Sequence, residues 1–415
     1  MQGGRRMVGP KSVMTPFLRK ILGMNWVLVL VMYGLLIFGV FMIESAARHL
    51  PVPKAVLEQY GSAGAYFAAK QKSFILIGSI GYFLAAFIDY RWIRWLGIPF
   101  YLVSLGLMAT VMVTGQDKDV YQLELPGGLL FQPAQLGITA GILLIAWLVQ
   151  DLPKLHRWFG APFIRIGIIG VIAAIPFLMV MKMGDMGSAL VWIPVAIVAL
   201  LIGGIPFRYL SCMALLGVGA LPLLYFIVLP LVSKRGPERI DVWLRMMHNK
   251  EVDILGDAYS PYYVSMAVGK AGWKGVGYKA PKESGSLIAK GFGSKTTAHN
   301  DYIFGVIGEE LGFRGSLLLL TAFALLLIQG LFIAFYSRDL TGRLLVCLVV
   351  ALFFAHIFES IGMCVLIMPV TGIPLPLISY SGTFVVICMF LLGLVQSVWI
   401  HRHWKPEAPV KQAEA

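Results

Sequence analysis

Long apolar stretches alternate with short polar ones along most of the 415-residue chain. A helix needs about 20 apolar residues to cross the hydrocarbon layer of a membrane. By this measure there are about ten spans, near residues 24–44, 72–89, 93–114, 133–150, 163–182, 188–204, 209–232, 305–335, 344–368 and 384–401. The pattern predicts an all-α polytopic membrane protein with about ten transmembrane helices. Because that number is even, both termini are expected on the same side.

The basic residues of the short loops predict the orientation, because cytoplasmic loops carry an excess of Lys and Arg. One face holds the basic N-terminus together with Arg91, Arg94, Lys154, Arg157, Arg165, Arg208, Arg338, Arg343, Arg402 and Lys405. The opposite face has fewer per short loop, namely Arg48, Lys54, Lys70, Lys72, Lys118 and Lys182. We therefore predict an N-in, C-in topology. The segment 233–300 is too long to count and becomes a large extracytoplasmic loop between helices 7 and 8.

Composition supports a membrane protein, since 58% of the residues are hydrophobic and 13% are charged, against roughly 25% charged in a soluble domain. In a soluble protein, the net charge of +13 would suggest binding to nucleic acid. Here it belongs to the cytoplasmic edges and the long loop, so we expect contact with membrane lipids and no nucleic acid. The predicted organisation is a cytoplasmic segment 1–22, a transmembrane domain 23–404 and a cytoplasmic tail 405–415.

The long loop combines many Lys and Arg residues with six Trp and Tyr residues and a seventh, Tyr302, at its exit, a density that favours a segment lying along the membrane interface. The run Tyr259–Gly269 is expected to form a short interfacial helix ended by glycines. Lys270 and Lys274 lie among those glycines. A basic, glycine-punctuated loop suits a phosphate or pyrophosphate head group. The alternative is a general attraction to anionic lipids.

Ionisable groups gather where this loop returns to apolar sequence, in the stretch 299–315. His299, Asp301 and the pair Glu309 and Glu310 stand there near one membrane surface. Such groups are costly near lipid, so they mark a candidate functional site. The plainer alternative is that Asp301 only caps the next helix. For the two glutamates we favour a structural role in the first helical turn, where carboxylates complement the helix dipole.

Other irregular stretches are predicted on the same face. Residues 115–133 read as a loop, and 182–188 interrupts an apolar run with two glycines and Asp185. The segment Pro369–Thr383 contains three prolines and two glycines, which exclude a continuous helix. Non-helical backbone near membrane depth is tolerated where it lines a wet cavity. Asp185, Asp301 and this segment are therefore expected to line one outward-facing cavity. No nucleotide loop, zinc signature or serine-hydrolase elbow occurs.

Three motifs, in this order along the chain, resemble those of the SEDS family of bacterial cell-wall proteins, the RodA/FtsW/SpoVE group. Asp185–Leu190 is similar to the family's Asp-Leu-Gly-Thr-Ala-Leu. His299–Gly312 is similar to His-Thr-Asp-Phe-Ile-Phe-Ala-Val-Ile-Gly-Glu-Glu-Leu-Gly. Pro369–Thr383 is similar to Pro-Val-Thr-Gly-Ile-Pro-Leu-Pro-Phe-Val-Ser-Tyr-Gly-Gly-Ser, and Ser265–Gly277 gives a weaker match. The resemblance covers nearly the whole chain except its first twenty residues.

The resemblance implies a peptidoglycan glycosyltransferase that polymerises lipid II at the outer face of the bacterial cytoplasmic membrane, for cell shape or division. It implies a class B penicillin-binding protein as partner. Asp301 matches the family's essential loop aspartate, and a carboxylate there can act as general base on the acceptor hydroxyl. The leaving pyrophosphate needs positive charge, from Lys or Arg or from a divalent cation such as Mg²⁺ or Mn²⁺. Candidate substrate-binding residues are His299, Asp185, Lys270, Lys274, Ser379, Glu309 and Glu310.

The chain also departs from the family pattern. The family's Arg-Arg-Trp is missing from 115–131, and Gln-Pro-Ser-Glu-x-x-Lys becomes Gln132-Pro133-Ala134-Gln135-Leu136-Gly137-Ile138. A carboxylate and an intramembrane lysine are thus lost together, which fits removal of one buried pair. Ser381 replaces a glycine. Two alternative functions are a scaffold without catalysis for the penicillin-binding protein, and a flippase or transporter of lipid-linked precursors.

Overall fold

The computed structural model describes residues 16–114, 123–125, 129–223, 226, 230, 235–248, 250–292 and 297–402. Its main helices are α1 (Pro16–Leu22), α2 (Trp26–Ala46), α3 (Lys54–Tyr60), α4 (Ala63–Phe87), α5 (Ile93–Thr114), α6 (Pro133–Leu155), α7 (Pro162–Lys182), α8 (Met186–Leu190), α9 (Trp192–Ile202), α10 (Phe207–Leu223), α12 (Arg235–Met247), α13 (Tyr259–Lys270), α14 (Ile303–Tyr336), α15 (Leu340–Cys364) and α16 (Gly382–Ile400). Within these ranges, every predicted span coincides with a helix or a helix pair.

Seven helices of the described chain are long and apolar enough to cross a membrane: α2, α5, α6, α7, α14, α15 and α16. Two further spans are shorter apolar helices, namely α8 with α9 and α10. The predicted span 209–232 coincides with α10 up to residue 223, and most of its remainder lies outside the described residues. The prediction of about ten spans is confirmed by position. Three of the spans, namely α4, α8 with α9, and α10, are not long and apolar enough to be counted with the other seven.

α4 begins nine residues earlier than the apolar pattern predicts. Ser62 stands at its N-cap, where the side chain accepts a hydrogen bond from Ala65 N. The part of the helix that the prediction left out ends with Lys70 and Gln71, polar residues that a count of apolar residues excludes. An N-cap satisfies backbone N–H groups that have no partner within the helix, so it sets the true start. The prediction that this span begins at residue 72 was wrong for this reason.

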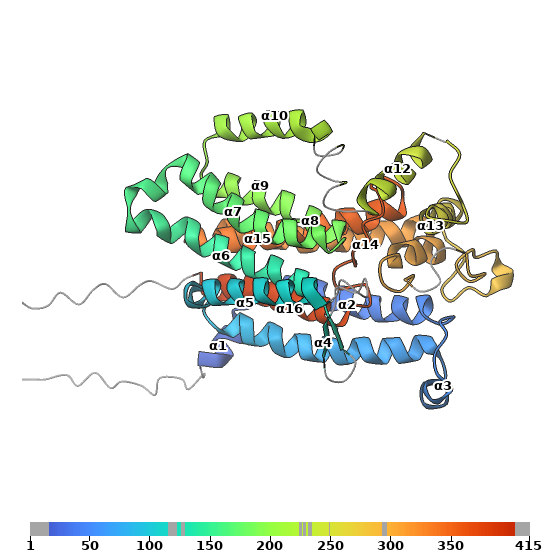
Figure 1. Ribbon diagram of the computed structural model, residues 1–415. Helices are drawn as coiled ribbons and strands as arrows, with labels where there is room; N and C mark the ends of the chain where they lie inside the picture. The colour runs from blue at the N-terminus through green and yellow to red at the C-terminus, as the bar shows by residue number, and fades with distance from the viewer. Residues whose placement is uncertain are drawn as a thin grey trace, which may run out of the picture.

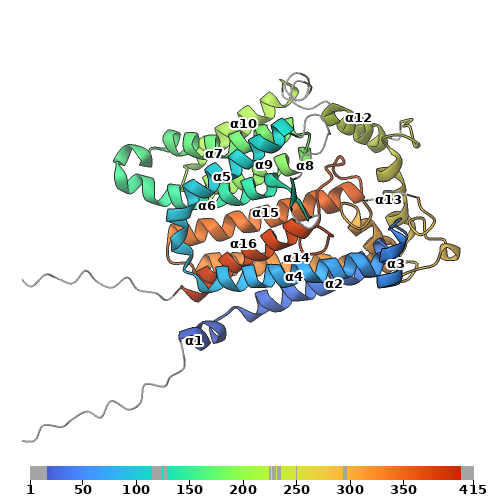
Figure 2. The same cartoon turned by 60° about the horizontal axis from the view of Figure 1, so that its bottom comes forward.

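The helices form one bundle with α15 near its centre (Figures 1 and 2). α15 is the most enclosed of the seven long helices, with 78% of its most apolar window buried. α10 stands apart from the bundle beside α9 (Figure 1). Many large apolar side chains remain exposed on the outer helices, for example Leu30, Leu76, Leu318 and Phe335. An apolar surface of this extent is typical of a membrane-facing bundle.

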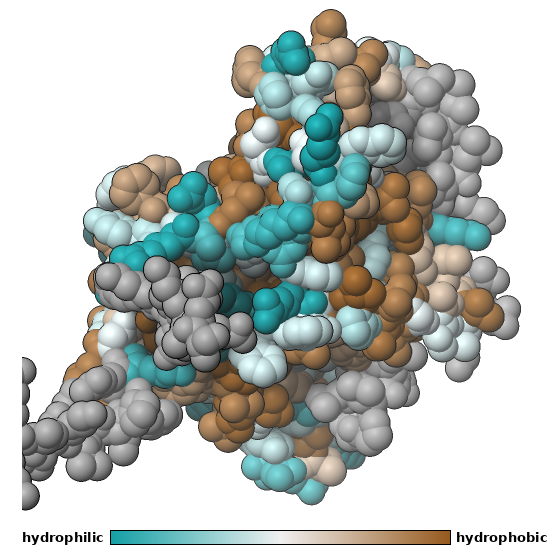
Figure 3. Space-filling view, turned by 90° about the vertical axis from the view of Figure 1, so that its left-hand side faces the viewer, coloured by the Kyte–Doolittle hydropathy of each residue, from teal (hydrophilic) through white to brown (hydrophobic). Residues whose placement is uncertain are grey.

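The two ends of the bundle differ. α1 and the end of α16 lie together at one end, whereas α3, α12 and α13 lie at the other (Figure 2). The first end shows a hydrophilic centre flanked by apolar groups (Figure 3). The loops that carry the predicted cytoplasmic basic residues contact one another at this end. Gln150 Oε1 accepts a hydrogen bond from Thr341 N at 2.5 Å, and Tyr90 donates to Asp339. Both ends of the described chain thus lie on one side, as an even number of spans requires.

Two short strands follow α5, where the sequence predicted only a loop. β1 (Leu123–Leu125) pairs antiparallel with β2 (Leu129–Phe131), with Leu123 opposite Phe131. Residues 115–122 and 126–128 of the predicted loop lie outside the described residues. The strands were missed because three residues are too few for a period-2 pattern to stand out.

α14 is broken at Gly312, whose φ of 67° and ψ of −161° are not helical. The loop between α13 and α14 fills the break. Phe313 N donates to Gly272 O at 2.9 Å, and Gly277 N donates to Glu310 O at 2.9 Å. Gly275 lies directly against Gly312, with no room for a side chain on either. A residue with positive φ at such a close approach is normally glycine, so the Leu-Gly that ends the motif His299–Gly312 fixes where the long loop docks.

Candidate functional site

Asp301 lies in the turn that precedes α14, and its side chain is half-buried. The turn is closed by a hydrogen bond from Tyr302 N to Thr297 O of 3.3 Å. Two charged groups, Asp185 and Arg239, act electrostatically on its carboxylate. Residues from three distant parts of the chain therefore meet at the end of the bundle that carries α12 and α13 (Figure 1).

Asp185 is held by hydrogen bonds at the N-cap of α8. Its Oδ1 accepts from Ser188 N at 3.0 Å, and its Oδ2 accepts from Gln132 Nε2 at 2.6 Å. Gln135 donates from Nε2 to Ser188 Oγ at 3.1 Å, and Ile138 is fully buried. Gln135, in place of the family's carboxylate, thus holds Ser188, whose backbone N–H donates to Asp185, and Ile138, in place of the lysine, belongs to the apolar core.

Arg239 is a site residue that the sequence analysis left among the basic residues of the long loop. It lies on α12, where Nη1 donates to Val370 O at 3.4 Å and Thr371 O at 3.5 Å. One turn later, Trp243 Nε1 donates to Leu366 O at 2.9 Å. Residues four apart share a helix face. Arg239 and Trp243 are four residues apart on an amphipathic segment. This spacing could have predicted a helix that packs with one face against another part of the protein.

The pKa of Asp301 is raised from its ordinary value to about 7. Burial is the main cause, and the negative charge of Asp185 raises the pKa further while Arg239 lowers it. Burial also raises the pKa of Asp185, against hydrogen bonds from Ser188 and Gln132 and the charge of Arg239. A carboxyl group with a pKa near neutrality beside a second carboxylate is suited to accepting and releasing a proton.

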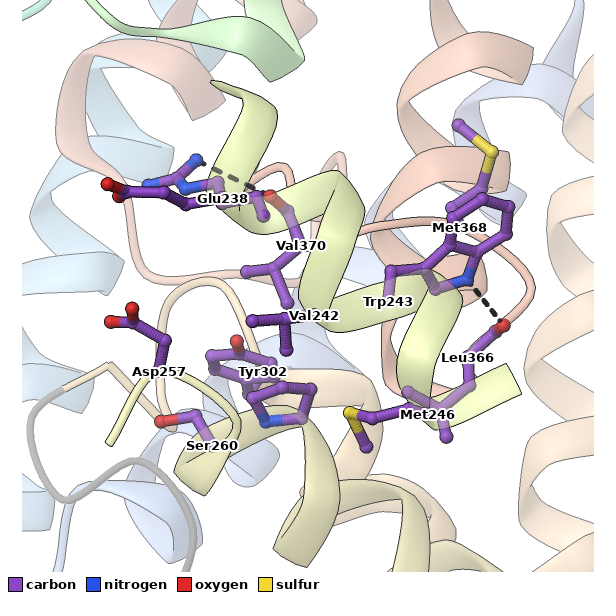
Figure 4. A pocket seen from close by; sticks show the side chains of 12 residues that line it. Glu238, Val242, Trp243, Met246, Asp257, Ser260, Tyr302, Leu366, Met368 and Val370 are labelled. Carbon is purple, nitrogen blue, oxygen red and sulfur yellow. Dashed lines mark hydrogen bonds between the residues drawn. The ribbon is translucent and has the colours of Figure 1, made fainter. Parts of the chain in front are cut away.

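A cavity of about 390 Å³ opens beside this cluster. Figure 4 shows it bounded by α12 on one side and by Tyr302, the residue after Asp301, on the other. Its charged lining residues are Glu238, Arg239 and Asp257, and Trp243 and Met368 form an apolar wall. The hydrogen bonds of Arg239 and Trp243 to the backbone of residues 366–371 fasten α12 over the cavity (Figure 4).

The segment Pro369–Thr383 is not a continuous helix, as predicted: it is non-helical up to Ser381, where α16 follows, and it forms another wall of the site. Gly372, with φ of 72°, lies so close to Asp301 that a Cβ there would be 3.8 Å from Oδ2. Ser379 is buried, and its Oγ donates to Asn300 O at 2.6 Å while accepting from Leu375 N at 2.8 Å. Ser379 therefore ties this segment to the Asp301 turn rather than facing a cavity. Ser381 has an extended φ of −161°, so glycine is not required there.

His299 is buried between the rings of Phe67 and Tyr380, with ring centroids at 4.7 and 5.3 Å. Burial lowers the pKa of its imidazole to about 4, so the ring is neutral at physiological pH. Its backbone O accepts a hydrogen bond from Tyr380 N at 3.0 Å. We assign His299 to packing of the Asp301 turn, because its ring packs against Phe67 and Tyr380, whose rings also contact each other at 5.0 Å.

The two glutamates have structural contacts, but not the ones predicted. The first turn of α14 contains no acidic residue, so neither glutamate complements the helix dipole there. Glu309 is buried and accepts hydrogen bonds from Ser286 Oγ at 2.8 Å and Leu287 N at 2.5 Å. Glu310 accepts from Ser45 Oγ at 2.5 Å. The prediction placed the helix start too late, and the carboxylates instead hold the long loop and the end of α2.

Tyr259–Lys270 forms α13, which confirms the predicted short helix. Lys270 and Lys274 are exposed at its end and in the following turn. The charged groups that act on Asp301 are Asp185 and Arg239, so the structure does not bring either lysine to Asp301. Glu359 of α15 was not predicted either: it is buried and acts electrostatically on Asp185.

The donor set near Asp301 does not fit a resident divalent cation on its own. Within the described ranges, no group of three or more His, Cys, Asp and Glu side chains could hold a metal ion. The cluster contributes two carboxylates and the positive charge of Arg239, whereas Mg²⁺ sites are built from several oxygen ligands.

The family described as cell cycle protein of the FtsW/RodA/SpoVE group matches residues 25–404. This chain belongs to that family. The FtsW/RodA/SpoVE assignment confirms the resemblance seen in the three motifs, and it covers all ten helical spans. With seven long apolar helices, the protein is an integral membrane protein.

Relatives in the family carry the names of cell-wall enzymes. The probable peptidoglycan glycosyltransferase FtsW of Geobacter metallireducens is 28% identical over 387 residues, covering 92% of this chain and 96% of the relative. Peptidoglycan glycosyltransferase MrdB of Escherichia coli K12 is 28% identical over 304 residues, covering 73% and 77%.

Two solved structures share the fold. One belongs to a study of how a peptidoglycan synthase complex coordinates polymerization and crosslinking, with a TM-score of 0.71 and 24% identity over 92% of this chain and 99% of that one. The other is the rod shape determining protein RodA of Thermus thermophilus, with a TM-score of 0.62 and 24% identity over 92% and 98%.

Proposed function

We propose that this protein is a peptidoglycan glycosyltransferase that polymerises lipid II into glycan strands, with Asp301 as general base. The observation that carries the proposal is the meeting of Asp301, Asp185 and Arg239 beside a cavity at one end of the bundle. The names of the FtsW and MrdB relatives support the reaction class.

The reaction joins two lipid-linked sugars, and the residues of the cluster have distinct parts in it. Asp301 accepts the proton of the acceptor's hydroxyl while that oxygen bonds to the donor's anomeric carbon and the bond to pyrophosphate breaks. A carboxyl with a pKa of about 7 is partly ionised at neutral pH and holds the proton after transfer. The electron pair leaves on the pyrophosphate, whose negative charge Arg239 stabilises from the cavity wall.

The proposed setting is the bacterial cytoplasmic membrane, with the site on the outer face and a class B penicillin-binding protein as partner. The basic connections at the opposite end of the bundle support this orientation. A solved relative of the same fold comes from a synthase complex that both polymerises and crosslinks, which supports the partner. A carrier of lipid-linked precursors is less favoured, because alternating access needs its polar site near mid-span, and this cluster lies at helix ends.

The experiment is a polymerisation assay with lipid II and the full chain, purified with its penicillin-binding partner. Glycan strands are the expected product, resolved by length on a gel. If the intact complex makes no strands while the partner crosslinks strands that are supplied, the protein is a scaffold and the proposal fails.

A further inference from the structure

Tyr302 brings a hydroxyl group to the cavity beside Asp301. Only 5% of its surface is exposed, and it lines the 390 Å³ cavity. Figure 4 shows its ring between Asp257 and Val242 of α12. The FtsW/RodA/SpoVE motif has Phe at this position, so the hydroxyl is a feature of this chain. The catalytic roles proposed for Asp301 and Arg239 do not involve it.

This hydroxyl is available to a molecule in the cavity. Among the described residues, none exchanges a hydrogen bond with Tyr302 Oη, and this oxygen is not one of the buried, unpartnered side-chain atoms that are closed off from solvent. The hydroxyl of a buried tyrosine usually has a hydrogen-bond partner. A reachable and unpaired hydroxyl in a cavity wall therefore indicates that the occupant of the cavity supplies the partner.

The wall of the cavity offers few other hydrogen-bond donors. Arg239 already donates from Nη1 to two backbone carbonyl groups. Glu238 and Asp257 are acceptors when they are ionised. The hydroxyl groups in the lining are those of Tyr302 and Ser260. Beside Arg239, these neutral donors are the groups that can pair with an anion in the cavity.

Tyr302 is the hydroxyl that lies close to the proposed base and cation. Burial raises the pKa of Tyr302 above its ordinary value, the negative charge of Asp301 raises it further, and Arg239 lowers it. The hydroxyl is therefore protonated at physiological pH and can donate. Since both Asp301 and Arg239 act on it electrostatically, one bound group can contact the hydroxyl and Arg239 together.

We propose that the Tyr302 hydroxyl donates a hydrogen bond to the pyrophosphate as it leaves, alongside Arg239. The bond from the anomeric carbon to the pyrophosphate oxygen breaks, and its electron pair stays on that oxygen. Asp301 takes the proton of the acceptor hydroxyl, while Tyr302 keeps its own. A donor directed at charge that develops in the transition state lowers the barrier more than it strengthens binding of the substrate. The inference rests on the proposed function and adds a catalytic residue to it.

Tyr302→Phe removes the hydroxyl alone and tests this role in the full-length protein with its penicillin-binding partner. We expect kcat for strand formation to fall by about tenfold, the worth of a hydrogen bond to a charged group. The KM for lipid II should change by less than about twofold, because the interaction strengthens in the transition state. An unchanged kcat would overturn the proposal.

Tyr263→Phe is the matched control. Tyr263 lies on α13, where its ring stacks on Phe292 with centroids 5.0 Å apart, and it is not among the residues that line the 390 Å³ cavity. The control variant should keep the kcat of wild type, and both variants should keep its unfolding midpoint. An equal loss of kcat in the two variants would show that the effect does not depend on the cavity.

The pH dependence of kcat/KM separates a role at the leaving group from a role through Asp301. The hydroxyl donates as a neutral group to the pyrophosphate, so Tyr302→Phe should leave the midpoint where wild type has it. A hydrogen bond from Tyr302 to the carboxylate of Asp301 would instead hold the pKa of Asp301 down. Loss of that bond would move the midpoint to higher pH, and such a shift would contradict the assignment.

Binding of inorganic pyrophosphate to the full-length protein in nanodiscs tests the site apart from the reaction. Tyr302→Phe should weaken binding by about fivefold, and Tyr263→Phe should not. Wild type that binds no pyrophosphate would contradict the site. Pyrophosphate binding that depends on Tyr302, in a complex that makes no strands, would remove the proposed function and leave the anion site. Strands from wild type, with kcat and pyrophosphate binding unchanged in Tyr302→Phe, would remove the role of Tyr302 alone.

Discussion

Asp301→Asn should lower the initial rate of glycan-strand formation by about a hundredfold to ten-thousandfold, the usual worth of a general base. Asn keeps the size and the hydrogen-bonding capacity of the side chain but cannot take the proton of the acceptor hydroxyl. Because burial raises the pKa of Asp301 and thus opposes its charge, the substitution should keep or increase thermal stability. Rates and unfolding midpoints measured on the same preparations separate lost chemistry from lost structure.

Asp241→Asn is the matched control for this variant. Asp241 lies on α12 in the same loop, is about half exposed, and pairs with Arg245 at 2.8 Å. An exposed ion pair of this kind contributes little to stability, so the control variant should form glycan strands at the wild-type rate. Strands at the wild-type rate from Asp301→Asn, or an equal loss in Asp241→Asn, would show that Asp301 is not the base.

Gly312→Ala should cost about 2 kcal/mol or more of stability, because the residue has a φ of 67° and a side chain is strained there. An added Cβ would also lie 2.7 Å from Trp273 O and 2.8 Å from Gly272 O. The loop 272–277 would be pushed away from α14, and the hydrogen bonds that Val276 N and Gly277 N donate to Glu309 O and Glu310 O would be weakened. The unfolding midpoint in detergent should fall by about 4 °C or more.

Gly34→Ala tests whether any added methyl in a membrane helix has this effect. Gly34 lies on the exposed side of α2, and a Cβ there meets nothing within 4 Å. Its midpoint should stay near that of wild type, within the range of surface substitutions. If both variants melt alike, the docking of the loop on the break in α14 is not a source of stability.

The helical spans could be predicted because crossing a membrane requires apolar length, which is visible residue by residue. The start of α4 could not be predicted in this way, since Lys70 and Lys72 lie inside the helix and its boundary depends on the cap at Ser62. The break in α14 was also missed, because Gly312 is one glycine within an otherwise continuous helical pattern. Its conformation becomes evident only when Gly275 is brought against it.

The candidate site was predicted in part. Asp185, Asp301 and the segment Pro369–Thr383 were expected to line one cavity, from their charge and irregular backbone. The structure brings them together, but of these only Val370 of the segment is among the residues that line the 390 Å³ cavity. Arg239 could not be singled out, because its role follows from how α12 packs on residues 366–371. Ser379, His299 and Glu309 resemble ligand-binding residues in sequence but are used for internal hydrogen bonds and packing, which depend on distant partners.

The dependence of kcat/KM on pH, compared between wild type and Arg239→Gln, tests most directly whether Asp301 is a base governed by its charged neighbours. The base must be deprotonated to act. Since burial and Asp185 raise the pKa of Asp301 to about 7 and Arg239 lowers it, activity should be low below pH 6 and rise through a midpoint near 7. Removing the positive charge of Arg239 should move that midpoint to higher pH and lower the plateau. A wild-type rate that stays constant from pH 5 to 8, or a midpoint that is the same in both proteins, would contradict this account.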